Sequence, residues 1–586
     1  MQETQNISLG GNVWKIEEID ENLSIRIAQT YNITQFLSRI LCVRGVGFND
    51  VENFINPKLQ KLMPDPNVLK DMQKASKRIA QAIISKEKIA IIGDYDVDGA
   101  TSTSILTRFF RLVGIEPLIH IPSREEGYGP SDLAFQEFKN ANTNIVITID
   151  CGTTAFDVLN RASQNGFEII VIDHHEAEAI LPQVYAVINP KRLDEENPYK
   201  YLEYMSAVGV GFMFLVSLNR ELRNSGFYEN HVEPNLMQLL DLVALGTVCD
   251  VVPLIGLNRA YVKQGLKVMA QQSNIGLKCL MASSSLTTAP ASYHLGYVLG
   301  PRINACGRVG DATLGSRLLC TENEEEAKNL AEKFNQFNTE RKEIENYVLL
   351  SAIEQIEKEP QEYPIAFAYG DDWHQGVIGI VAGKLKERYN VPAFVMSIET
   401  DEVKGSARSI AGIDLGALII SAKEHGVITA GGGHVMAAGF SLTVEQIPEF
   451  RKFVGEYVLE KLGKEKIAPV LNIDCSVNLL AVNENLADEL SILEPYGANN
   501  PEPQFLLKRV IITKPQIVGS GHVKCILSSP MGGNLKAISF RCADNDIGNA
   551  ILNAKGEIFN VVGHIKSDVW QGRKNIQFII NDIARE

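Results

Sequence analysis

The chain has 586 residues, which predicts two to four domains, and its 45% hydrophobic and 22% charged content is typical of a globular protein. Its 71 Asp and Glu outnumber its 56 Lys and Arg, and the resulting net charge of −15 argues against a general binder of polyanions. The N-terminus lacks the pattern of a secretory signal, no apolar stretch reaches about 20 residues, and the nine Cys form no Cys-x-x-Cys pair, so we expect a cytoplasmic protein with reduced thiols and no membrane contact.

The N-terminal half begins with an amphipathic helical pattern over residues 1–70, which includes a loop near Pro57, Pro64 and Pro66. From residue 71 onward, short apolar runs alternate with segments that are mostly helical in pattern. The four runs are residues 89–93, 117–121, 145–149 and 168–172. This alternation predicts an α/β domain over residues 71–321, built on a mainly parallel, doubly wound sheet.

Three carboxylates follow the first of these runs. Asp94, Asp96 and Asp98 lie within Gly93–Gly99, directly after the run and before a helix expected from Ala100 to about Leu112. Carboxylates this close repel one another unless a cation lies among them. An exposed acidic turn, or an Asp that caps the helix, would be the structural alternative.

Other strand ends repeat this chemistry. Asp150 follows the third run, Asp173-His174-His175 follow the fourth, and Asp250 follows the apolar segment 242–249. Taken singly, these residues could be a helix cap, core imidazoles and a turn residue. Ligands of open α/β sheets bind beyond the carboxyl ends of the strands, so together they predict one site.

Mixed carboxylate and imidazole ligands suit a divalent cation, with Mn²⁺ favoured and Mg²⁺ as the alternative. The number of acidic groups suggests two ions about 3.5–4 Å apart, bridged by one carboxylate. Such a pair activates water and neutralises phosphoryl oxygens, which makes phosphate-ester hydrolysis the expected reaction.

The ordered motifs GDYDVDG, TIDCG, IDHHE and GTVCDVVPL resemble the DHH phosphoesterase family over residues 90–255. The resemblance implies that Asp94, Asp96 and Asp150 hold one ion, and that Asp98, Asp150, His174 and Asp250 hold the other. Asp150 would bridge the two ions, and His175 would face the scissile phosphate as a second catalytic residue. Ile92 stands where the family often has His, and Asp94 looks like its replacement, as in the RecJ branch.

The sequence beyond residue 321 continues this similarity. Residues 322–360 read as a long connector helix, and residues 361–463 as a second α/β domain that looks like the DHH-associated (DHHA1) substrate domain. The resemblance implies that substrate is bound by Arg124, Tyr128, Arg302, Asn304, Ser406, Arg408, Gly432, Gly433 and His434. In the second domain, the Arg could instead be an ordinary surface residue and the glycine run a flexible turn. Tyr128 could instead be an aromatic residue packed in a loop.

Residues 464–586 show short strands separated by Gly, Pro and Asn turns, which predicts an OB-like β-barrel. Residues 502–586 contain 11 Lys and Arg against 7 Asp and Glu, a local excess of +4. The basic residues include Lys508, Arg509, Lys524, Arg573 and Lys574, and Trp570, Phe540 and Phe578 could offer stacking faces, although Phe in alternating strands is more often core. Such a barrel would bind single-stranded nucleic acid.

The RecJ branch implies a metal-dependent 5′-to-3′ exonuclease of single-stranded DNA, active in DNA repair and recombination. Its partners would be single-stranded DNA, a single-strand-binding protein and a helicase, and we expect a monomer. One alternative is another DHH enzyme, acting on short oligonucleotides, cyclic dinucleotides or pyrophosphate. A non-catalytic DNA-binding or replisome scaffold with the same fold is the other.

Overall fold

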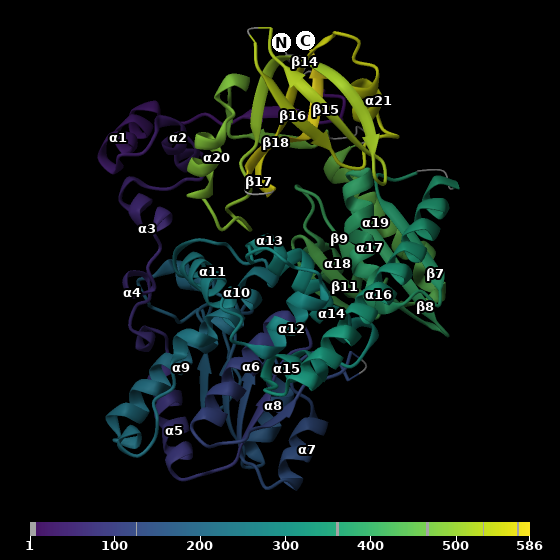
Figure 1. Ribbon diagram of the computed structural model, residues 1–586. Coiled ribbons are helices and arrows are strands. Elements are labelled where there is room, and N and C mark those ends of the chain that lie inside the picture. Colours follow the sequence, from purple (N-terminus) through teal and green to yellow (C-terminus); the bar gives the residue numbers. More distant parts are fainter. Residues whose placement is uncertain (1–6, 125, 359–361, 464–467, 531, 571–572) are drawn as a thin grey trace. The chain divides into compact units, whose positions relative to one another are not determined.

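The computed structural model describes residues 7–124, 126–358, 362–463, 468–530, 532–570 and 573–586, with the side chains of 568–570 and 573 excepted. The chain forms two compact units (Figure 1). The larger contains Ile16–Phe337, Ile473–Asn581 and Arg585–Glu586, and the smaller contains Met1–Lys15, Asn338–Asn472 and Asp582–Ala584.

The larger unit begins with four short helices, as the pattern over residues 1–70 predicts. They are α1 (Glu21–Tyr31), α2 (Gln35–Val43), α3 (Val51–Ile55) and α4 (Leu59–Leu62). The side chain of Asp20 accepts backbone N–H groups at the start of α1, and that of Thr34 does so at the start of α2. These are the residue types that begin helices most readily.

The α/β part of this unit is built on a five-stranded parallel sheet with strand order β3-β2-β4-β5-β6. Its strands are β2 (Ile89–Ile92), β3 (Leu118–His120), β4 (Ile145–Ile149), β5 (Glu168–Ile172) and β6 (Ala186–Ile188). Because the chain runs from β2 outward to β3 and then back to β4, the order reverses between β2 and β4. The carboxyl ends of these two strands form the crevice in which ligands of such sheets bind.

Alternate residues of β2, β4, β5 and β6 enter two different cores, which is why these strands are mostly apolar, whereas Leu118 and Ile119 of the edge strand β3 are exposed. Ile91 and Ile147 pack in the core that contains residues of α5, α6, α9 and α10, whereas Ala90 and Val146 pack against α7 and α8. The predicted doubly wound parallel sheet is confirmed. The helices named are α5 (Met72–Ile84), α6 (Val97–Leu112), α7 (Asp132–Asn140), α8 (Phe156–Gln164), α9 (Ala207–Asn224) and α10 (Leu240–Cys249).

Two local expectations about this unit are wrong. Helix α6 begins at Val97 and not at Ala100, because the Asp96 carboxylate accepts the N–H of Gly99 and so caps the helix earlier. Asp250 follows helix α10 and not a strand. A short, wholly apolar run has no periodicity that separates a buried strand from a buried helix.

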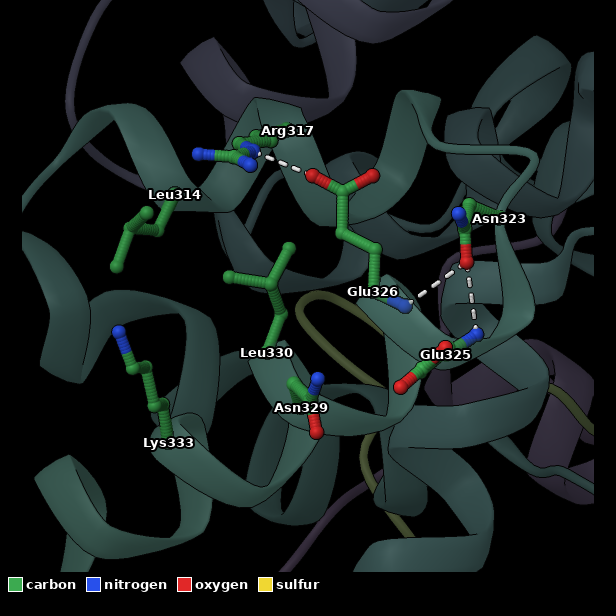
Figure 2. Close-up of a pocket in the computed structure, with 8 residues that line it drawn as sticks. All are labelled: Leu314, Arg317, Asn323, Glu325, Glu326, Asn329, Leu330 and Lys333. Atoms are coloured by element: carbon green, nitrogen blue, oxygen red, sulfur yellow. Dashed lines mark hydrogen bonds and ion pairs between the residues drawn. The ribbon is translucent and has the colours of Figure 1, made fainter.

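Further helices complete the larger unit: α11 (Gly256–Met269), α12 (Ile275–Ser283), α13 (Ser292–His294), the π-helix η6 (Leu295–Leu299), α14 (Gly300–Val309) and α15 (Thr313–Cys320). The expected long helix is α16 (Glu324–Lys358), and the boundary between the two units falls within it. Figure 2 shows its first turn, where the Asn323 side chain accepts the N–H groups of Glu325 and Glu326. The surface pocket drawn there, 390 Å³ in volume, contains none of the predicted site residues.

The C-terminal part of the larger unit holds the predicted barrel, because β14 pairs with both β15 and β17 and so closes the sequence β14-β15-β16-β18-β17. Its elements are β13 (Cys475–Ser476), α20 (Glu484–Ser491), β14 (Phe505–Val518), β15 (His522–Ser528), β16 (Asn534–Ser539), α21 (Asp546–Leu552), β17 (Ile558–Trp570) and β18 (Arg573–Arg585). Phe578 is fully buried and therefore belongs to the core, whereas Phe540 is exposed. The side chains of Trp570 and Arg573 lie outside the described residues.

The smaller unit is α/β, as predicted, with a mixed sheet of order β10-β11-β9-β8-β7. Strands β7 and β8 are parallel and the other pairs are antiparallel. Its elements are β7 (Ala366–Asp371), α17 (Gln375–Tyr389), β8 (Ala393–Glu399), β9 (Glu402–Arg408), α18 (Leu415–Glu424), β10 (Ala430–His434), β11 (Ala437–Thr443) and α19 (Ile447–Leu462).

Residues from both ends of the chain meet in the smaller unit. The Asp582 carboxylate accepts hydrogen bonds from the Ser8 hydroxyl, the Gly10 N–H and the Trp14 indole. Strand β1 (Val13–Ile16), which the sequence analysis did not predict, pairs with β12 (Val470–Ile473). Across the described part of the chain, none of the helices has the length and apolar character that a membrane span requires.

Candidate metal centre

The predicted metal ligands lie together at the carboxyl end of the parallel sheet. They form three overlapping groups, and within each group the candidate ligand atoms are within 4.8 Å of one another. The groups are Asp94-Asp96-Asp150, Asp98-His174-Asp250 and Asp150-His174-His175. The loop after β2, the residue after β4, the residues after β5 and the end of α10 each contribute at least one of these side chains.

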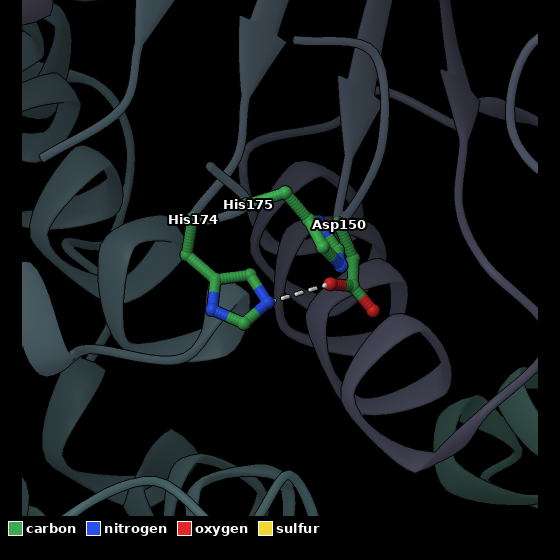
Figure 3. A group of neighbouring side chains, drawn as sticks. All are labelled: Asp150, His174 and His175. Atoms are coloured by element: carbon green, nitrogen blue, oxygen red, sulfur yellow. Dashed lines mark ion pairs between the residues drawn. The ribbon is translucent and has the colours of Figure 1, made fainter. Parts of the chain in front are cut away.

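His174 belongs to two of these groups, and Asp150 links them to the third. Its Nε2 lies 3.3 Å from Asp150 Oδ1, as Figure 3 shows, and 3.9 Å from Asp98 Oδ2. Its Nδ1 lies 3.6 Å from Asp250 Oδ2. Burial lowers the pKa of His174 to about 3, so the ring is neutral at physiological pH and has a lone pair for a cation.

Asp98 is fixed by the start of helix α9. Its Oδ2 accepts the N–H of Ala207 at 2.6 Å, and its Oδ1 accepts the N–H of Val208 at 3.0 Å. A helix N-terminus stabilises an anion through such free N–H groups. The sequence analysis missed this support, and the small residues of Ser-Ala-Val-Gly at 206–209, just where a helix begins, were the available signal.

The cluster is electrostatically strained without a cation. Burial, and then the neighbouring carboxylates, raise the pKa of Asp98 and Asp150 well above the usual range, and raise the pKa of Asp94 and of Asp250 to about 7. Asp94 Oδ1 and Asp250 Oδ2 are buried without a hydrogen-bond partner among the described residues. Divalent cations bind carboxylate oxygens, and they would supply the positive charge that these desolvated oxygens, which have no donor, lack. The residues present therefore fit a pair of such ions.

Asp173, the first residue of the Asp-His-His triplet, does not belong to the three groups of candidate metal ligands. Its Oδ1 accepts the His175 ring Nδ1–H at 2.8 Å and the His174 N–H at 2.8 Å, and its Oδ2 accepts the Thr153 N–H at 2.9 Å. Burial alone would raise the pKa of Asp173, but the His175 hydrogen bond and its charge lower it below the usual range. From its place after the strand, Asp173 was grouped with the site in the sequence, but its role in orienting His175 was not predicted.

Tyr128, a predicted substrate residue, lies beside the cluster. Its hydroxyl donates to the backbone carbonyl of Asp150 at 2.7 Å and lies 3.3 Å from His175 Nε2. The ring is 51% exposed and meets the His175 ring edge-on, with centroids 5.7 Å apart. The hydroxyl is thus anchored at the site while about half of the residue's surface remains open to solvent.

Arg124 connects the acidic loop to helix α14. Its Nε–H donates to the carbonyl of Gly307 at 2.6 Å, and its guanidinium lies 4.4 Å from the centroid of the Tyr95 ring. An added Cβ on Gly307 would lie 2.6 Å from the Tyr95 carbonyl oxygen, so only glycine allows this approach.

Two predicted substrate residues lie on α14 itself. The Arg302 guanidinium donates to the carbonyl of Val298 and to Asn335 Oδ1 of helix α16, both at 2.6 Å. Asn304 is half-buried on the same helix. Arg302 is thereby oriented by two acceptors within the larger unit.

The remaining predicted substrate residues lie on β9 and β10 of the smaller unit, the two strands that flank β11. Gly439 of β11 pairs with Ser406 of β9 on one side and with Gly432 of β10 on the other. Arg408 Nη1 donates to Ser406 Oγ at 3.1 Å, and burial lowers the pKa of Arg408. A Cβ on Gly379 of α17 would lie 3.0 Å from Ser406 Oγ and 3.1 Å from Arg408 Nη2, so the start of this helix lies close to both side chains.

The glycine run has two different environments. A Cβ on Gly433 would lie 2.4 Å from the Ala437 carbonyl oxygen, so the turn of the β10–β11 hairpin requires glycine there. A Cβ on Gly432 would meet nothing within 4 Å, and this backbone is therefore open to a ligand. His434, at the end of β10, is exposed.

Comparison with known proteins identifies three domain families in the chain. The N-terminal domain of the DHH family matches residues 88–247, the DHHA1 domain matches residues 362–460, and the RecJ OB domain matches residues 473–582. The last match separates this chain from the other DHH enzymes considered above.

Curated relatives match the chain along most of its length. The single-stranded-DNA-specific exonuclease RecJ of Bacillus subtilis is 33% identical over 97% of this chain and 70% of the relative. RecJ of Dickeya dadantii is 32% identical over 94% of this chain and 96% of the relative. The crystal structure of Thermus thermophilus RecJ with Mn²⁺ superposes with a TM-score of 0.81 at 26% identity, covering 98% of this chain and 79% of that one. The chain therefore belongs to the RecJ family of single-stranded-DNA-specific exonucleases.

Proposed function

We propose that this exonuclease removes nucleotides from the 5′ end of single-stranded DNA, using two divalent cations held by the carboxylate–imidazole cluster. The proposal is supported by the buried oxygens of Asp94 and Asp250, which have no hydrogen-bond donor among the described residues, beside a neutral His174. Mn²⁺ is favoured over Mg²⁺ because imidazole takes part with the carboxylates, and the Thermus thermophilus relative has been crystallised with each of the two ions.

The ligands divide between two sites that share one residue. Asp94, Asp96 and Asp150 would form the first site, and Asp98, Asp150, His174 and Asp250 the second. Asp150 is suited to bridge because it belongs to the first group and also lies 3.3 Å from His174 of the second. Bound there, the cations would lower the pKa of a water molecule and neutralise charge on the phosphoryl oxygens.

His175 would act on the scissile phosphate, and Asp173 would position it. Burial lowers the pKa of His175, but the Asp173 hydrogen bond together with the negative charges of Asp173, Asp250 and Asp94 outweighs it, so the net pKa is raised. The ring can therefore hold a proton on Nε2 for the leaving oxygen, or stabilise negative charge there. Asp173 keeps Nδ1 occupied, which leaves Nε2 toward Tyr128 and the cluster.

Substrate contacts would come from both units. We assign Arg302 and Asn304 of the larger unit to a substrate phosphate, and likewise Ser406 and Arg408 of the smaller unit, since a guanidinium flanked by a hydroxyl suits a phosphate. Backbone N–H groups of Gly432 and Gly433, together with His434, would contact the next phosphate. Arg124 would bind the backbone and Tyr128 would stack on a base.

The wider setting follows from the family. We propose a role in DNA repair and recombination, a cytoplasmic location, a monomeric state, and a single-strand-binding protein and a helicase as partners. The domain boundaries proposed are those of the sequence analysis, at residues 70, 321, 360 and 463.

The decisive experiment uses DNA labelled at one end. With Mn²⁺, 5′-labelled single strands should release labelled mononucleotide at once, 3′-labelled strands should shorten gradually, and duplex DNA should persist. Asp150→Asn should abolish hydrolysis while binding to single strands persists. The matched control is Asp241→Asn, a buried Asp on α10 outside the cluster, which should remain active. Loss of label from the 3′ end first, or a fully active Asp150→Asn, would refute the proposal.

A further inference from the structure

Two tyrosines form an exposed ring stack on the helical stretch that leads into α14. Tyr293 of α13 is 59% exposed and Tyr297 of η6 is 74% exposed. Their ring centroids are 5.1 Å apart and the ring planes differ by 25°, so the rings are stacked. Leu295 and Leu299, on the same stretch, are fully buried. The leucines account for the packing of this stretch, and the tyrosine pair is left facing solvent.

A lysine from the barrel joins this ring pair. Lys566 of β17 places its Nζ 5.6 Å from the centroid of the Tyr293 ring. The side chain of Lys566 is itself exposed. Proteins that bind single strands without base specificity combine aromatic faces, on which bases stack, with cations along the phosphate backbone. The two rings and the lysine supply both elements at one place.

The helical stretch that carries the ring pair packs against residues next to the metal centre. The Cys249 thiol, next to Asp250, donates to the carbonyl of Leu295 at 3.4 Å. A Cβ added to Gly300 would lie 2.5 Å from Cys249 Sγ, so η6 packs closely on the last residues of α10. The same helical stretch continues into Arg302 two residues later. A π-helix within an α-helical stretch is often found at functional sites.

We propose that Tyr293, Tyr297 and Lys566 form a base-stacking platform that holds the single strand beside the metal centre. The proposal rests on the function proposed above, because it needs a single-stranded substrate. Two rings accommodate any base sequence, since every base offers a π-face. Lys566 would neutralise a phosphate of the nucleotide that stacks on Tyr293.

The test compares ring removal with ring replacement in the full-length protein. The dissociation constant for a fluorescent 12-nucleotide single strand is measured in EDTA, which prevents hydrolysis. The double variant Tyr293→Ala/Tyr297→Ala should raise it about 5-fold to 150-fold for each stacked base that is lost. Tyr293→Phe/Tyr297→Phe should keep wild-type affinity. Tyr347→Ala, which removes another exposed tyrosine, is the matched control and should not change it.

Abasic DNA identifies the ligand of the rings. Wild-type protein should lose affinity when the base is removed at one or two particular positions, and the double alanine variant should not lose it there. Lys566→Gln should reduce the slope of log affinity against log salt by about 0.7, the value for one phosphate of a single strand.

Three results would overturn the platform. The first is wild-type affinity in the double alanine variant, and the second is an equal loss of affinity on abasic DNA in both proteins. The third is an altered oligomeric state of the double alanine variant with unchanged affinity, which would make the ring pair an interface between copies. A wild-type protein that fails to hydrolyse single strands would refute the proposed function instead. The two failures are therefore distinguishable.

Discussion

Asp94 and Asp250 show how single residues oppose folding in the absence of metal. Each has a pKa of about 7 in the folded chain because of burial and the neighbouring Asp96. An unfolded Asp has a pKa of about 3.9. At a pH between these two pKa values, both carboxyl groups have lost their protons in the unfolded chain but keep them in the folded chain. The stability of the metal-free protein therefore falls as the pH rises through this window.

A bound cation should reverse this loss, since it replaces the protons. We predict that Mn²⁺ raises the melting temperature of EDTA-treated protein by several degrees more at pH 8 than at pH 5.5. Thermal denaturation followed by circular dichroism checks this. In Asp94→Asn/Asp250→Asn the dependence on pH should be weaker, because the two groups no longer titrate. An equal metal effect at both pH values would contradict the argument.

At the scale of elements, the close packing of helices α6, α9 and α10 determines the position of the Asp98 carboxylate. A Cβ added to Gly246 of α10 would lie 2.3 Å from Thr101 Oγ1 of α6, 2.7 Å from Val208 Cγ1 of α9 and 2.8 Å from Asp98 Oδ1. Glycine at this position therefore sets the distance between α10 and the N–H groups that hold Asp98.

Gly246→Ala should separate α10 from α6 and α9 and displace the Asp98 carboxylate. We expect the variant to lose about 1–3 kcal/mol of stability through overpacking, and to need at least tenfold more Mn²⁺ for half-maximal activity. Denaturant unfolding and a Mn²⁺ titration measure the two effects. Gly383→Ala on α17 is the control, because its Cβ would meet nothing within 4 Å, and it should stabilise by up to about 1 kcal/mol. Unchanged Mn²⁺ dependence in Gly246→Ala would refute this account.

The sequence predicted the elements that carry local signals. The runs that became β2, β4 and β5 are apolar and β-branched, and their carboxyl ends identified Asp150 and His174 as neighbours. Asp250 was grouped with them correctly, although its element is a helix. The N–H groups of α9 that hold Asp98 are 109 and 110 residues away in sequence, so no spacing rule reveals them.

At the scale of the whole molecule, one buried arginine connects segments that are far apart in sequence. Arg259 of α11 is fully buried, and its guanidinium donates to the carbonyls of Phe54, Leu493, Glu494 and Pro495. Its charge also lies 4.0 Å from the centroid of the Phe54 ring. The N-terminal helices, the catalytic half and the entry to the barrel are thus joined by a single side chain.

Arg259→Met should leave several of these carbonyls without a donor, at about 1–3 kcal/mol for each that stays buried. We predict a lower melting temperature, and a larger loss of single-strand affinity than of activity toward a dinucleotide. Differential scanning calorimetry and the two substrate assays test this. Arg220→Met, which removes an exposed ion pair with Asp65, should have little effect on either. A melting temperature equal to that of the wild type would show that the junction does not depend on Arg259.

The bonds from Ser8, Gly10 and Trp14 to Asp582 also determine when folding can end. Ser8 and Asp582 are 574 residues apart in the chain, so during synthesis Ser8 must wait for this partner until Asp582 has been made. At roughly 5–20 residues per second, that wait is about half a minute to two minutes. The smaller unit should therefore reach its final form only after Asp582 has left the ribosome, and until then the segment around Ser8 should be open to proteases.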